Sequence, residues 1–105
     1  MSIEEKKEYL KSYRIQQAKI RRFEQMLYEA PEKKDKYLKC LESAAVKRDK
    51  IEEEIESVDG GILSEILFQK YVCCHSLEEI SYMISYSKRQ TERMHMKALA
   101  VFEKK

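Results

Sequence analysis

The chain has 105 residues, of which 43% are hydrophobic, enough for one modest core but not for two independent ones. Two Gly and one Pro beside 38% charged residues exclude a turn-rich β protein, and no stretch approaches the roughly 20 consecutive apolar residues that span a bilayer. The formal net charge of +2 excludes no class of partner, so the distribution of the charge matters more than its sum.

The N-terminal part of the chain predicts a long helix. Apolar residues at spacings of three, four or seven mark one face of a helix from Ile3 to about Glu29; they are Tyr9, Tyr13, Ile20, Phe23 and Leu27. Because the aromatic residues follow core spacing, we interpret them as packing residues rather than as a platform for single-stranded nucleic acid. Pro31 disfavours helix at the residue before it but suits a first helical turn, which predicts a second helix that begins near Pro31.

That second helix is predicted to run up to Asp59-Gly60-Gly61, where two glycines favour a helix end. The residues of its inner face alternate steps of four and three: Tyr37, Leu41, Ala44, Arg48, Ile51, Ile55 and Val58. Two long helices joined by a short connection predict an antiparallel, coiled-coil-like hairpin over residues 1–61. This segment carries 14 basic and 14 acidic side chains and therefore no net charge of its own.

Three shorter helices are predicted after the glycines. The first contains the apolar residues Leu63, Ile66, Leu67 and Tyr71. Ser76-Leu77-Glu78-Glu79 then places a hydroxyl and a carboxylate three residues apart, as a capping box requires, so a helix is expected to begin at Leu77. The same signal at Ser87-Lys88-Arg89-Gln90 predicts a last helix that runs to about Phe102.

Two caps eleven residues apart, with an eight-residue helix and the tight Ser85-Tyr86 connection between them, are typical of a helix-turn-helix. The small residue that such a crossing needs is Ser81, and β-branched Thr91 takes a position that is more often apolar. The expected apolar positions are Ile80, Ile84, Tyr86 and Met94. The predicted fold class is all-α, a long antiparallel helical hairpin followed by a tri-helical helix-turn-helix unit at 62–105.

Residues 63–102 resemble region 4 of the bacterial sigma factors. Ile66 to Val72 resembles the helix that precedes that motif, Ser76 to Ser81 its first helix, and Ser87 to Leu99 its recognition helix. The whole layout, a charged hairpin followed by this unit, is similar to small phage late-gene activators of the ArpU and RinA kind. The chain departs from the pattern in having Ser85 where the turn usually carries Gly, and in the hydroxyl of Thr91.

The resemblance implies a recognition helix whose N-terminal residues meet base edges in the major groove of double-stranded DNA. The residues expected to contact bases are Lys88, Arg89, Gln90, Glu92 and Arg93, and those expected at phosphates are Ser76, Lys97, Lys104 and Lys105. Residues 85–105 fit this role, since they carry six basic and only two acidic side chains.

The implied protein is a cytoplasmic transcription regulator at promoters, an activator or accessory factor rather than a complete initiator. Its hairpin is expected to serve either self-association or contact with RNA polymerase; a homodimer is favoured, because two half-sites compensate for one small module. No membrane partner is expected. The alternative is a helical protein–protein interaction module that does not bind DNA.

No catalytic, cofactor-binding or metal-binding residues are expected. Cys73-Cys74-His75 lacks the four ligands and the Cys-x-x-Cys spacing of a zinc site, and together with Cys40 the cysteines are expected to be free thiols, the vicinal pair at least half-buried. His95 is expected to pack or to contact phosphate. The many carboxylates are expected on charged helical surfaces rather than in a pocket, so an enzyme is not predicted.

Overall fold

The computed structural model describes residues 1–105 and contains helices and short connections without strands, which confirms the all-α prediction. The first helix, α1, spans Ile3–Glu29 as predicted. A capping box that the sequence analysis did not identify begins it: the Ser2 hydroxyl accepts from the Glu5 N–H, and the Glu5 carboxylate accepts from the Ser2 N–H, both at 3.1 Å. These hydrogen bonds hold the pKa of Glu5 below its usual value.

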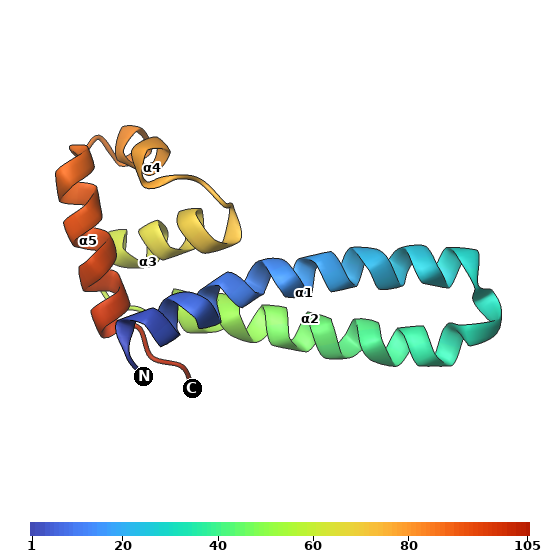
Figure 1. The fold of residues 1–105 in the computed structure, drawn as a ribbon. Helices are drawn as coiled ribbons and strands as arrows, with labels where there is room; N and C mark the ends of the chain where they lie inside the picture. Colours follow the sequence, from blue (N-terminus) through green and yellow to red (C-terminus); the bar gives the residue numbers. More distant parts are fainter.

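The second long helix begins slightly later than predicted. Pro31–Lys33 forms a 3₁₀ turn, η1, in which the Lys33 N–H donates to the Ala30 carbonyl at 3.0 Å, and α2 then spans Lys34–Glu56. Proline favours this tighter first turn because its fixed φ suits it and its missing N–H is not needed there. Figure 1 shows α1 and α2 running antiparallel as a long hairpin that extends away from the rest of the chain.

Two tyrosines of α1 bind carboxylates of α2 across the hairpin. The Tyr9 hydroxyl donates to Glu54, and the Tyr13 hydroxyl donates to Glu52. Glu54 is only 3% exposed, so the expectation that the carboxylates all lie on the surface is wrong for this residue. Its second oxygen accepts from the backbone N–H of Lys105, which supplies the partners that a buried charge needs.

The chain turns at Gly60 and Gly61, with φ of 93° and 34°, and continues as α3 (Ile62–Leu67), which passes directly into one π-helical turn, η2 (Phe68–Val72). Helix α4 spans Leu77–Ile84, and α5 spans Lys88–Val101, ending one residue before the predicted Phe102. In Figure 1, α5 stands across the open end of the hairpin, close to both termini.

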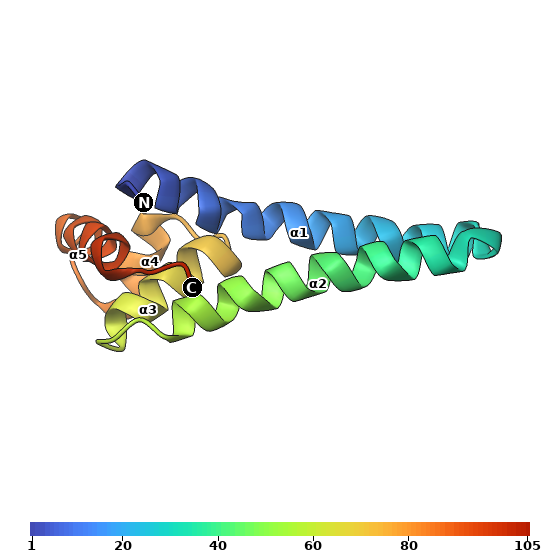
Figure 2. The same cartoon turned by 90° about the horizontal axis from the view of Figure 1, so that it is seen from below.

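Both segments of the chain contribute to one core. Figure 2 shows α1 and α2 separating towards the end at which α3 and η2 lie. The buried cluster there contains Leu10, Tyr13, Ile51, Ile55, Val58, Leu63, Leu67, Tyr71, Ala98, Leu99 and Phe102. The Lys6 ammonium also donates to the Leu99 and Ala100 carbonyls, at 2.9 and 3.1 Å, where α5 ends. The base of the hairpin therefore supports the helix-turn-helix unit directly.

None of the helices is both long and apolar enough to cross a membrane.

Candidate nucleic-acid interface

Two capping boxes set the first residues of α4 and α5. The Ser76 hydroxyl accepts from the Glu79 N–H, the Ser87 hydroxyl accepts from the Gln90 N–H, and the Glu79 and Gln90 side chains each accept from the N–H of their capping serine, all at 3.1 Å. Both boxes are as the sequence predicts. They satisfy amides that a helix leaves unpaired in its first turn, so each helix begins at a defined residue.

The turn between the two helices depends on Ser85. This residue has a left-handed backbone conformation, with φ of 59° and ψ of 34°. It stands at the turn position where a helix-turn-helix usually carries Gly. The chain then folds back so that the Tyr86 N–H donates to the Ser81 carbonyl at 3.0 Å. This hydrogen bond is of the kind that ends a helix by closing its last carbonyls.

Small and β-branched residues lie where α4 meets α5. Ser81 is a small residue and is buried. Its hydroxyl donates to the Glu78 carbonyl, so the buried polar group has a hydrogen-bond partner. Thr91 is fully buried, and its hydroxyl donates to the Ser87 carbonyl one turn earlier, at 2.9 Å. Tyr86 is 39% exposed, so the expectation that it fills an apolar position of the crossing is wrong.

The outward face of α5 carries most of the expected DNA-contacting side chains. Exposed on it are Lys88, Arg89, Glu92, Arg93 and Lys97. The four ion pairs of the structure all lie elsewhere, so these cations are free to meet an external anion. Arg89, Glu92, Arg93 and Met96 line a shallow cavity along this face.

Two of the expected contact residues are already engaged. The Gln90 Oε1 accepts from the Ser87 N–H, which directs this oxygen towards the cap and leaves the amide Nε2 free to donate to an adenine edge. The Ser76 hydroxyl accepts from the Glu79 N–H and keeps its own O–H to donate, but Glu78 and Glu79 place two carboxylates in the first turn of α4. Such negative charge disfavours a phosphate beside Ser76.

His95 lies in the core and not on the outward face. It is 5% exposed, and its Nε2 lies 2.9 Å from the Tyr71 hydroxyl. Burial, with the nearby charges of Lys70 and Lys7, lowers the pKa of His95 to about 4. Burial also raises the pKa of Tyr71 to about 12, so at neutral pH both groups are uncharged and share this hydrogen bond, whose direction depends on the tautomer of the imidazole. Of the two roles expected for His95, packing or phosphate contact, the buried position fits packing.

A groove beside α5 brings Glu92 and His95 together with three lysines that the sequence analysis did not select. It has a volume of about 410 Å³ and is lined by Lys7, Lys11, Lys70, Tyr71, Leu77, Glu92, His95 and Met96. The lysines come from α1 and η2, and Glu92 and Met96 also line the shallow cavity on the outward face of α5. The two hollows are therefore adjacent. Helical spacing places Lys7 and Lys11 on one face of α1, but nothing local in the sequence places that face beside α5.

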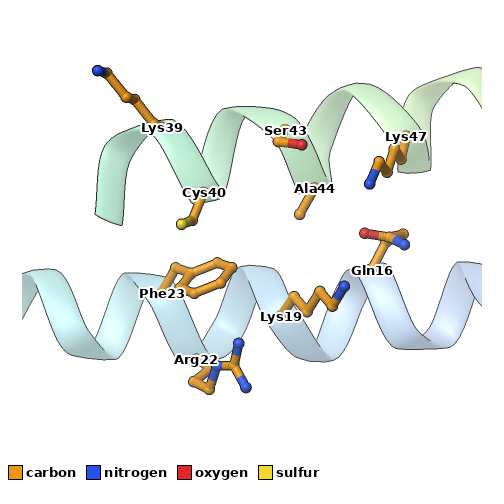
Figure 3. A pocket seen from close by; sticks show the side chains of 9 residues that line it. All are labelled: Gln16, Lys19, Arg22, Phe23, Lys39, Cys40, Ser43, Ala44 and Lys47. Carbon is orange, nitrogen blue, oxygen red and sulfur yellow. The ribbon is translucent and has the colours of Figure 1, made fainter. Parts of the chain in front are cut away.

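A second positively charged cavity lies between the long helices (Figure 3). Its nine lining residues include Lys19, Arg22, Lys39 and Lys47 and no carboxylate. Figure 3 shows Phe23, Cys40 and Ala44 pointing into the space between the helices, whereas Arg22 and Lys39 extend away from it. This cavity belongs to the hairpin and contains no residue of the helix-turn-helix unit.

Apolar and thiol side chains are exposed near α4. Tyr82 and Met83 are 77% and 52% exposed on its outer side. Cys73 and Cys74 are exposed free thiols, so the expectation that they are at least half-buried is wrong. The Arg14 Nε donates to the Cys74 sulfur at 3.0 Å. No three His, Cys, Asp or Glu side chains come together in a group that could hold a metal ion.

Lys104 and Lys105, which were expected to contact phosphate, both contact the hairpin. The Lys104 ammonium is 4.7 Å from the centre of the Tyr9 ring, and the backbone of Lys105 is bound to Glu54.

Comparisons of this chain with protein-family models, with curated proteins and with solved structures find no significant match.

Proposed function

We propose that this chain is a DNA-binding regulator of transcription of the phage or prophage type, an accessory factor or activator that acts at promoters in the cytoplasm. The observation that carries the proposal is the capped α4–turn–α5 unit, whose second helix presents Lys88, Arg89 and Arg93 without carboxylate partners. A helix with this exposure and charge suits the major groove of duplex DNA.

The contacts proposed for α5 follow from side-chain chemistry. Arg89 and Arg93 both line the shallow cavity, and the guanidinium of an arginine can donate two hydrogen bonds to guanine O6 and N7. Glu92, between them in sequence, can accept from a cytosine amino group. Lys97, one turn further along the helix, is proposed to contact phosphate.

The hairpin is proposed to pair with a second copy of the chain or to contact RNA polymerase. It projects away from α5 and leaves its own surface open to such a partner (Figure 1). Sedimentation equilibrium of the purified protein distinguishes the two, since a dimer that forms without polymerase favours pairing between hairpins.

The test of DNA binding is selection from a randomised duplex pool, followed by fluorescence anisotropy on the recovered duplex at low and at physiological salt. We expect selective binding that persists at physiological salt and weakens as salt rises, because bound phosphates release counterions. The Arg89→Ala, Arg93→Ala double variant should lose about 10-fold or more in affinity, since each good bidentate pair with a base contributes roughly 1 to 3 kcal/mol of discrimination. The matched control is Arg21→Ala with Lys39→Ala, which removes the same charge from exposed hairpin positions.

A protein-interaction module is the second candidate, favoured by the exposed Tyr82 and Met83 on α4. Recovery of no preferred duplex, or equal binding of every duplex that disappears with salt, would exclude sequence-specific regulation. The exposed apolar surface of Tyr82 and Met83 would then be the proposed binding site for a protein partner.

A further inference from the structure

We propose that the groove formed by Lys7, Lys11 and Lys70 holds the phosphate backbone of the DNA strand that flanks the site read by α5. This inference rests on the proposed function and extends it to two elements other than α4 and α5, namely α1 and η2. The ligand chemistry is a phosphodiester, recognised by charge and not by base sequence.

The groove is positioned for this role because it adjoins the face of α5 that carries Arg89 and Arg93. Glu92 and Met96 line both hollows, so a strand that passes over the outward face of α5 meets the groove next. Proteins that read bases with one helix commonly fix its register through phosphate contacts from neighbouring elements. Here the neighbouring elements are α1, at the end of the hairpin that packs beside α5, and η2.

The charges around the groove favour an anion. Three lysines line it against a single carboxylate, Glu92. Lys70 has no carboxylate partner; its ammonium lies 5.8 Å from the centre of the Tyr71 ring. Burial lowers the pKa of Lys70, and repulsion from the positive charges of Arg14, Lys11 and Lys7 lowers it further. A bound phosphate would offset this repulsion.

Two further carboxylates near the groove form weak ion pairs with Lys7 and Lys11. Glu4 lies 3.4 Å from Lys7 and Glu8 lies 3.6 Å from Lys11, both with carboxylates at least three-quarters exposed. Exposed pairs of this spacing contribute little to stability, so a phosphate can displace them. The buried residues that line the groove, Tyr71 and His95, are hydrogen-bonded to each other. His95 is uncharged at neutral pH, so it adds no charge to the groove.

The test compares two triple variants with the same loss of charge. Lys7→Gln, Lys11→Gln, Lys70→Gln removes the groove cations, and Lys19→Gln, Lys39→Gln, Lys47→Gln removes three from the hairpin cavity of Figure 3. Affinity for the selected duplex and for a random duplex is measured by anisotropy over a range of salt, with thermal unfolding to establish that both variants fold.

The groove variant should bind both duplexes more weakly by the same factor, on the order of 10- to 100-fold at physiological salt. Its salt slope should be shallower by about 3, because each lost phosphate contact removes about one unit. The control triple should change both quantities much less. Equal effects of the two triples, or a loss confined to the selected duplex, would overturn the proposal while leaving DNA binding by α5 intact, whereas a parent chain that binds no duplex would remove the proposed function as well.

A competition arm distinguishes backbone phosphate from free phosphate. Inorganic phosphate, added at constant ionic strength, should displace the duplex no better than chloride does. Displacement specific to inorganic phosphate, absent in the groove variant, would assign the groove to a free anion instead.

Discussion

The Tyr71 hydroxyl and the His95 Nε2 lie 2.9 Å apart in the core and join η2 to α5. Protonation at Nε2 would leave the imidazole without an acceptor for the phenol O–H and would place a charge in the core. Burial accordingly lowers the pKa of His95 from its ordinary 6.5 to about 4. The stability of the folded chain is therefore coupled to pH through His95.

Stability should fall as the pH is lowered from 6.5 towards 4. Over this range the unfolded chain binds a proton at His95 and the folded chain does not, so acid favours unfolding; above pH 6.5 the residue is neutral in both states and contributes no slope. His95→Gln keeps a polar partner for Tyr71 without this titration and should flatten the dependence of the urea midpoint on pH. His75→Gln at the half-exposed histidine is the control, and an unchanged slope in His95→Gln would contradict the assignment.

Leu10→Ala should destabilise the helix-turn-helix unit as well as the hairpin. Leu10 is fully buried in α1, in one core with Leu99 and Phe102 of the C-terminal segment. A buried Leu→Ala change costs about 2 to 5 kcal/mol in the free energy of unfolding. Urea unfolding, followed by circular dichroism and by hydrogen exchange of the α5 amides, should show both segments weakened. Ile15→Ala, at an exposed position of the same helix, should stay within about 0.5 kcal/mol of the parent.

Ser85→Gly should stabilise the protein by about 0.5 to 1 kcal/mol. Ser85 is left-handed, a conformation that costs a residue with a Cβ roughly 1 kcal/mol or more and costs glycine little. The greater freedom of glycine in the unfolded chain offsets part of this gain. Ser57→Gly provides the contrast, because Ser57 is right-handed with φ of −78° and should lose stability. A fall in the melting temperature of Ser85→Gly would show that the turn carries no relievable strain.

Ser87→Ala should lower the free energy of unfolding by about 0.5 to 2 kcal/mol and weaken DNA binding. The hydroxyl of Ser87 satisfies the Gln90 N–H at the start of α5, and its loss frays the turn that carries Lys88 and Arg89. Ser43→Ala, at an exposed position within α2, removes a hydroxyl without removing a cap. Equal stability of these two variants, measured by urea unfolding, would mean that the cap does not hold the helix.

Local rules in the sequence were sufficient for the limits of several helices of this protein, but they did not indicate the π-helical turn η2. A capping serine acts on amides within three residues, so the first residues of α4 and α5 could be predicted without knowledge of what surrounds them. The same holds for the end of α1 before Pro31. The buried hydroxyl of Thr91 could be accommodated for a similar reason, because its partner, the Ser87 carbonyl, is only one turn away.

The tertiary structure alone decided which surfaces meet. Lys7 and His95 are far apart in the sequence, and no local pattern states that the base of α1 packs beside α5. Likewise Glu54 reads as one of a run of surface carboxylates, and only the approach of Tyr9 and Lys105 makes it a buried, satisfied charge. Periodicity defines which side of a helix is apolar, but the partner of that side depends on the packing of the whole core. The residues of α5 proposed to read DNA were therefore accessible from sequence, whereas the groove beside them was not.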